Sequence, residues 1–250
     1  MMFWRKIKQR IQKFLSKRTI SFSAKTNPDS SVEFKLSISP QEDSKETEEM
    51  LQRYASKNIK TIGALSSQET FISLALTAVY FFRRGIYVAS TRYAEEALRI
   101  EPRENNLRIL LIKIYGNYIG SPDAKQKAVD MCDEAIKIEQ NNYQPYFLKA
   151  LYTSHLKKEN DSIPLYLKAK ELMEAQKSTT LSDYGQLCCF LGSLYLKESN
   201  YKDEKQAEIL FRQAILSLQP CADEHNKFWL NHAKKLLDEL LSNSQRAKDL

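Results

Sequence analysis

The chain has 250 residues, which is enough for one or two domains with a substantial buried core. Its hydrophobic fraction of 42% and charged fraction of 28% are those of an ordinary globular protein and exclude disorder along the whole chain. Only 6 residues are glycine, against a usual ~7%, which favours helices over turn-rich sheets. The longest apolar stretch, residues 71–82, is interrupted by Ser73 and Thr77 and is shorter than the ~18 residues that a membrane span needs.

The positive charge is concentrated at the N-terminus. The net charge is +7, yet residues 1–25 alone contribute +8 and contain no acid. The other 225 residues carry 30 basic and 31 acidic side chains. The chain is therefore a near-neutral body with a basic arm, and this distribution argues against nucleic-acid binding by the whole protein.

The first predicted element is a basic amphipathic helix over residues 2–18, in which apolar and basic residues recur at helical spacing. Three alternatives stay open for it: an anionic membrane surface, docking on a partner or on the rest of the chain, and a cleaved organelle presequence. An alternative of another class is nonspecific nucleic-acid binding through its charge. The residues that carry these alternatives are Phe3, Trp4, Arg5, Lys6, Ile7, Lys8, Arg10, Ile11, Lys13, Phe14 and Leu15.

The period then changes from helix to strand. Apolar and polar residues alternate over residues 20–24 and again over 32–38, and a turn cluster of Thr, Asn, Pro, Asp and Ser lies between them. This pattern predicts a β-hairpin that ends at Pro40. An acidic stretch from Glu42 to Glu49 then opens a leading helix that carries Met50, Leu51, Tyr54 and Ile59.

From residue 68 onward the pattern is helical, and one phrase recurs four times. Its central alanines are residues 97, 135, 169 and 214, so the spacings are 38, 34 and 45 residues. Small residues at such positions let two helices cross closely, and the larger residues between them fill the gaps between neighbouring units. The long spacings predict insertions near residues 116–122, 179–185 and 200–203. The four phrases read YAEEALRIEP (93–102), MCDEAIKIEQ (131–140), LYLKAKEL (165–172) and LFRQAILSLQP (210–220).

These residues resemble the tetratricopeptide repeat, a helix–turn–helix unit of about 34 residues. The fourth copy matches best, with Leu191-Gly192-x2-Tyr195, then Ala207-x3-Phe211, then Pro220, and with Cys188 where the family has Trp. The resemblance covers about residues 68–220 and implies a mainly α fold: an α-solenoid of about four repeats. The other three copies match at Leu74, Ala78, Phe81, Gly85, Ala97 and Pro102; at Leu111, Tyr115, Ala128 and Ala135; and at Tyr146, Ala150, Tyr166 and Ala169.

After the repeats, residues 223–243 predict one more amphipathic helix, which would cap the solenoid, with a frayed tail from Asn243. The apolar face of this helix carries Phe228, Trp229, Leu236, Leu237, Leu240 and Leu241. We therefore divide the chain into four parts. They are residues 1–40 (basic helix and hairpin), 41–67 (linker and leading helix), 68–222 (repeats) and 223–250 (capping helix and tail).

The resemblance also implies a groove lined by the first helix of each repeat, which binds a peptide or helix of another protein. The Lys and Asn clamp that some relatives use for chaperone carboxylates is absent, because Ala75, Val79, Phe147 and Leu151 stand at its positions. A largely apolar groove predicts an amphipathic helix or an apolar segment as the ligand, unless the chain's own helix over 42–60 covers it. The candidate groove residues are Val79, Phe82, Arg83, Ile109, Lys113, Phe147, Leu151 and His155.

No catalytic or cofactor motif occurs, and the 4 cysteines and 3 histidines lack metal-ligand spacing, so we expect neither an enzyme nor a bound cofactor or metal. The absence of a disulfide framework indicates a reducing compartment. The sequence thus predicts a cytoplasmic scaffold or adaptor that binds a protein or peptide and is recruited to the membrane by its arm. A mitochondrial location and a dedicated chaperone for an apolar segment of a secreted or membrane protein are the alternatives. The oligomeric state stays open.

Overall fold

The computed structural model describes residues 20–26, 32–38, 67–119, 121–176, 180–197, 201–221 and 223–248. The chain divides into two compact units, residues 1–124 and 125–250, which we describe separately. The predicted basic helix over residues 2–18 and the leading helix over 42–60 lie outside the described residues.

Unit 1 begins with two strands. β1 (Ile20–Thr26) and β2 (Val32–Ile38) pair antiparallel, from Ile20 opposite Ile38 to Thr26 opposite Val32. Residues 27–31, which would complete the predicted hairpin, lie outside the described residues. Strand β2 contacts α5 (Asn105–Lys113), the first helix of the second predicted repeat.

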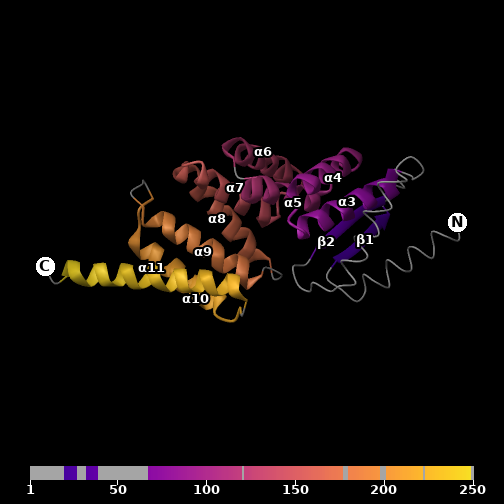
Figure 1. Ribbon diagram of the computed structural model, residues 1–250. Coiled ribbons are helices and arrows are strands. Elements are labelled where there is room, and N and C mark those ends of the chain that lie inside the picture. Colours follow the sequence, from indigo (N-terminus) through magenta and orange to yellow (C-terminus); the bar gives the residue numbers. More distant parts are fainter. Residues whose placement is uncertain are drawn as a thin grey trace. The chain divides into compact units, whose positions relative to one another are not determined.

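Helices α3 (Ser67–Arg83) and α4 (Tyr87–Ile100) form an antiparallel pair (Figure 1). α3 is apolar on nearly every side, and such a helix is stable only when most of its surface is buried. It accordingly contributes Phe71, Leu74 and Ala78 to the core. Gly85 makes the turn between the two helices with a φ of +71°, a conformation that glycine adopts without strain.

The first predicted insertion takes the form of a π-helix. α5 passes directly into η2 (Ile114–Ile119), which places the extra residues at the end of the helix instead of in a loop. The ring of Tyr118 in η2 stacks on Tyr87 at the start of α4, with centroids 4.0 Å apart. A π-helix is rare. The stack of Tyr118 on Tyr87 is an aromatic contact that stabilises this one.

Unit 2 consists of helices. α6 (Pro122–Ile138) starts in unit 1 and continues into unit 2, where it is followed by the antiparallel pairs α7 (Tyr143–His155) with α8 (Glu159–Ala175) and α9 (Leu181–Tyr195) with α10 (Glu204–Leu218). α11 (Glu224–Lys248), yellow in Figure 1, packs on α9 and α10. The prediction of a mainly helical chain with helices packed in pairs is confirmed.

The residues predicted at close helix crossings are buried. The four central alanines, Ala97, Ala135, Ala169 and Ala214, each have 0% exposure. A Cβ on Gly192 would lie 2.9 Å from Cε1 of Phe211, closer than real Cβ contacts allow. The repeat phrase therefore marks where helices touch, as its small residues predicted.

The last helix is longer than the sequence pattern predicted. Asn243 was expected to begin a frayed tail, but α11 continues as helix to Lys248. The residues beyond Asn243 include Gln245, Arg246, Ala247 and Lys248, which have good intrinsic helix propensity and so favour continuation of the helix. Leu237 and Leu240 pack on Ala207 and Phe211 of α10, so α11 covers the last pair as a cap should.

Candidate protein-interaction surface

Aromatic side chains from three alternate helices of unit 2, α7, α9 and α11, form a continuous row, which we call the aromatic run. Phe147 of α7 lies 6.2 Å from Phe190 of α9, and Phe190 lies 4.7 Å from Trp229 of α11, measured between ring centroids. Phe228 meets the Trp229 ring edge-on at 5.4 Å. The aromatic run is thus Phe147, Phe190, Trp229 and Phe228.

The run changes from packed to exposed along its length. Phe147 and Phe190 are half-buried because both contact the ring of Tyr166, which is fully buried. Phe228, at the other end, is 62% exposed. An exposed aromatic ring that continues a packed aromatic row offers apolar area to a partner at little cost in side-chain entropy.

Hydrogen bonds hold the start of α11 in place beneath this exposed ring. Ser182 of α9 donates its hydroxyl to Asn226 at 2.6 Å, and the Cys189 thiol donates to the Trp229 carbonyl at 3.8 Å. The indole N–H of Trp229 donates to Nε2 of His225 at 3.2 Å. The first two of these hydrogen bonds tie the start of α11 to α9, which fixes the backbone that carries Phe228.

The predicted groove residues of unit 1 differ in how much surface they offer. Val79 and Ile109 are 2% and 5% exposed, so their side chains belong to the core. Phe82, Arg83 and Lys113 are half-buried. Phe82 meets the ring of Tyr118 edge-on at 5.7 Å, so η2 covers part of it.

The predicted groove residues of unit 2 lie on α7. Phe147 and Leu151 are half-buried, and His155 is exposed at the end of the helix. Partial burial, with a smaller contribution from the charge of Lys125, lowers the pKa of His155 below its ordinary value of 6.5. His155 is therefore neutral at pH 7 and adds no charge to this surface.

Sequence reasoning missed Phe190 as a surface residue and assigned Phe228 and Trp229 only to the apolar face of the cap. When the repeats are aligned on Ala150 and Gly192, Cys189 and not Phe190 falls at the position of Phe147. The alignment therefore pointed to a residue that is 1% exposed. The succession of aromatic residues on alternate helices was the available signal.

Other candidate chemistry is weak. Burial raises the pKa values of the Cys188 and Cys189 thiols to about 12, which leaves both protonated and unreactive at neutral pH. Across the described ranges, no group of three or more His, Cys, Asp or Glu side chains could hold a metal ion. In the same ranges, no helix is both long and apolar enough to cross a membrane.

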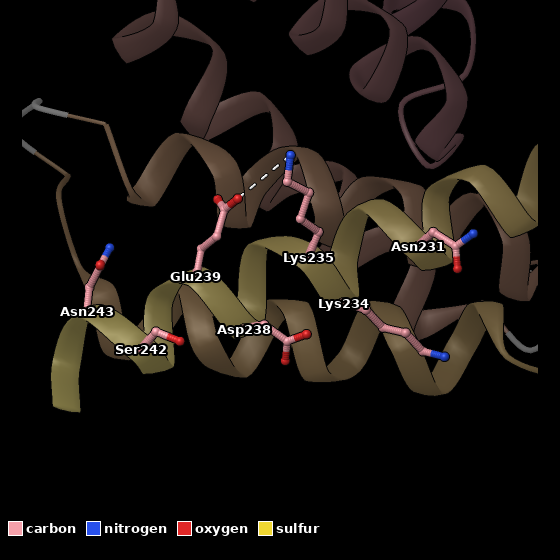
Figure 2. A pocket seen from close by; sticks show the side chains of 7 residues that line it. All are labelled: Asn231, Lys234, Lys235, Asp238, Glu239, Ser242 and Asn243. Carbon is pink, nitrogen blue, oxygen red and sulfur yellow. Dashed lines mark ion pairs between the residues drawn. The ribbon is translucent and has the colours of Figure 1, made fainter. Parts of the chain in front are cut away.

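A shallow hollow runs along the exposed side of α11 (Figure 2). Its lining is polar and contains both signs of charge, including an ion pair of 3.8 Å between Lys235 and Glu239. Because one helix supplies every lining residue, the hollow is the solvated side of the cap and not a binding cleft. The lining residues are Asn231, Lys234, Lys235, Asp238, Glu239, Ser242 and Asn243.

Solved structures resemble this fold at low sequence identity. TTC0263, a thermophilic TPR protein of Thermus thermophilus, is 12% identical and covers 74% of this chain and 88% of its own, with a TM-score of 0.52. MamA of AMB-1 is 14% identical over 73% of this chain and 93% of its own, with a TM-score of 0.50. A double mutant of MamA of RS-1 is 11% identical over 71% of this chain and 98% of its own, also with a TM-score of 0.50.

A scan against protein-family models found no match, and a search of curated proteins by sequence also found none. The structural likeness concerns the fold. Together with the repeat phrases and the buried alanines, it shows that the helical part of this chain has the tetratricopeptide-repeat fold.

Proposed function

We propose that this protein is a non-enzymatic interaction scaffold that binds an apolar segment or an amphipathic helix of another protein along the aromatic run. The observation that carries the proposal is the exposed ring of Phe228 at the end of a packed aromatic row. Aromatic residues dominate the binding energy of protein interfaces because they bury a large area with few rotatable bonds.

The composition of the run argues for the class of ligand. Its members are uncharged, and the neighbouring histidine His232 stacks nearly parallel to Phe228, with an angle of 7° between the rings and 6.2 Å between their centroids. A helix that lays an apolar face into a groove presents side chains at positions i, i+3 and i+7, which suits a row of rings on the alternate helices α7, α9 and α11.

Affinity capture with single-site variants tests the proposal. Wild type and Phe228→Ser would be used as baits in lysates of the source cell, with proteins quantified by mass spectrometry. We expect Phe228→Ser to lose the partner that the wild type enriches, by roughly tenfold or more, which is the usual effect of removing a hot-spot aromatic residue.

Leu216→Ser is the matched control, because Leu216 is also exposed, at 71%, but lies on α10 and outside the run. It should capture the same partner as the wild type. If Phe228→Ser captures the same proteins in the same amounts, the aromatic run is not the binding surface. The half-buried Phe147 is a poor probe, because its ring packs on Tyr166 and its removal would disturb the core.

We also propose that the basic arm recruits this scaffold to anionic membrane surfaces. Residues 1–25 carry eight basic side chains and no acid, and each such charge near an anionic bilayer contributes about 1 kcal/mol at most. Removing apolar residues from the arm, in Ile7→Ser/Ile11→Ser, should weaken sedimentation with anionic vesicles while leaving partner capture by the aromatic run unchanged.

A further inference from the structure

Unit 1 exposes a second apolar surface, at the end where α3 turns into α4 and where η2 ends. Four large apolar side chains are exposed on these two segments, which the Tyr87–Tyr118 stack brings together: Ile86 at 48% exposure, Val88 at 81%, Tyr118 at 47% and Ile119 at 41%. We call these four residues the loop-end patch. Exposed apolar residues that occur singly are normal on a protein surface, but a cluster of them marks a contact surface.

Two ring contacts hold the patch together. Tyr118 stacks on Tyr87, whose chain neighbours are Ile86 and Val88, and Tyr118 also meets Phe82 edge-on at 5.7 Å. The insertion that lengthens the second repeat thus places Tyr118 and Ile119 beside the α3–α4 turn. Two segments that are about thirty residues apart in the chain form the patch. The patch therefore exists only when the chain is folded.

The chain that forms the α3–α4 turn carries charge of a single sign. Between Phe71 and Ala94 it contains three arginines, Arg83, Arg84 and Arg92, and no acid. Arg92 is exposed and lies one helical turn after Val88, so the two share a face of α4. The next acid along the chain is Glu95, whose carboxylate accepts the hydroxyl hydrogen bond of Tyr115 at 2.6 Å.

We propose that the loop-end patch is a membrane-contact surface that inserts its apolar side chains among the headgroups of an anionic bilayer. Ile86, Val88 and Ile119 would enter the boundary between headgroups and acyl chains, and the exposed Arg84 and Arg92 would meet lipid phosphates. The hydroxyls of Tyr87 and Tyr118 would lie at headgroup depth, where tyrosine is enriched.

This inference extends the proposed recruitment by the basic arm and supplies the second contact that stable membrane binding needs. A single weak anchor gives reversible and marginal attachment, whereas two anchors on one molecule multiply their effects. The sign of the charge favours a lipid surface over a protein partner, because arginines beside exposed apolar side chains complement the phosphates that cover a bilayer uniformly. A protein partner would have to present its own acidic patch.

Vesicle sedimentation of the full chain tests this assignment. The vesicles would be phosphatidylcholine with about one third phosphatidylserine, compared with phosphatidylcholine alone, at low and at high salt. The patch variant is Val88→Ser/Ile119→Ser, and the arm variant is Ile7→Ser/Ile11→Ser. The matched control is Ile209→Ser/Leu216→Ser, which removes two side chains that are 48% and 71% exposed on α10.

We expect the patch variant to lower the vesicle partition coefficient by about tenfold, in the wild-type and in the arm-variant background, because it removes two inserting side chains. The control should bind like the wild type, and thermal unfolding should show that all variants are folded. Binding should weaken at high salt and on vesicles without phosphatidylserine.

A patch variant that partitions like the wild type overturns the inference and assigns the surface to a protein contact. Recruitment by the arm would still stand in that case if the arm variant loses binding. If the arm variant binds like the wild type and the patch variant does not, the patch stands and recruitment by the arm fails. A wild-type chain that binds no anionic vesicle overturns both.

Discussion

Gly192 lies where α9 comes close to α10 in unit 2. Its α-carbon faces the ring of Phe211, and there is no room for a methyl group between them. Both residues belong to the best-matching repeat, where Phe211 is fully buried. The packing of one repeat therefore depends on the absence of a single side chain.

Gly192→Ala should destabilise the protein by about 1–3 kcal/mol, the usual cost of forcing extra volume into a packed core. Urea denaturation followed by circular dichroism would measure the loss. In the Phe211→Leu background the same glycine substitution should cost less, since the ring that it clashes with is gone. Equal losses in both backgrounds would contradict the close approach.

Tyr143 links two repeats through a single hydrogen bond. Its hydroxyl donates to Oδ2 of Asp183 at 2.7 Å, which joins α7 to α9. Burial, followed by the negative charge of Asp183, raises the pKa of Tyr143 above its ordinary value of 10. The folded protein therefore keeps this proton at pH values where the unfolded chain releases it.

This difference predicts that Tyr143 makes stability fall as the pH rises above 10, because the unfolded state then binds fewer protons than the folded state. Tyr143→Phe should lower the free energy of unfolding by about 1 kcal/mol at neutral pH, where the hydrogen bond is intact in the wild type. Between about pH 10 and 11 the free energy of unfolding of Tyr143→Phe should fall less steeply than that of the wild type. Unfolding midpoints measured against pH would show this, and parallel curves would contradict it.

At the scale of elements, the ends of the helices are specified by local capping side chains. Asn142 begins α7 by accepting a hydrogen bond from the Gln144 amide at 3.0 Å, and Asp203 begins α10 by accepting from the Gln206 amide at the same distance. Such caps satisfy backbone groups that have no partner inside the helix. They fix where α7 and α10 begin.

Asn142→Ala should cost about 1 kcal/mol, since it removes the cap of α7 and leaves the Gln144 amide without its partner. The neighbouring Asn141→Ala is a matched control, because the side chain of Asn141 is exposed and does not cap the helix. The control should change the free energy of unfolding by less than about 0.5 kcal/mol. Chemical denaturation of both variants would decide between a cap and a solvated loop residue.

On the scale of the whole molecule, stability comes from neighbour-to-neighbour packing. Each helix pair has an apolar face that it cannot bury alone, so the last pair depends on a cap. α11 provides that cap: Leu237 and Leu240 cover Phe211, and Trp229 covers Phe190. The long polar side of the same helix faces solvent, as the hollow of Figure 2 shows.

Removing residues 224–250 should therefore expose the apolar face of α9 and α10, lower the thermal midpoint of unit 2 and promote aggregation. Removing only residues 243–250 is the matched control, because it leaves Leu237 and Leu240 in place. Size-exclusion chromatography and thermal unfolding would compare the two truncations. A full-cap truncation that stays monomeric and as stable as the control would show that α11 is not a cap.

The helical periods, the four recurring alanines and the chain order of the repeats were determined by the sequence alone, because they depend on side-chain size and spacing within one short segment. The spacing of the repeats also located the insertion near residues 116–122. It did not predict that the insertion would continue α5 as a π-helix. Local patterns predict which segments are helical and which residues must be small.

What lies on the surface was decided by tertiary structure. Val79 and Ile109 stand at groove positions in the repeat pattern and yet are buried, whereas Phe228, assigned to the apolar face of a cap, is largely exposed. The exposure of an apolar side chain depends on which distant segment packs on it, as the η2 insertion packs on Phe82. Helical periodicity identifies the apolar face of each helix, but only the packed neighbours determine how much of that face remains available for a partner.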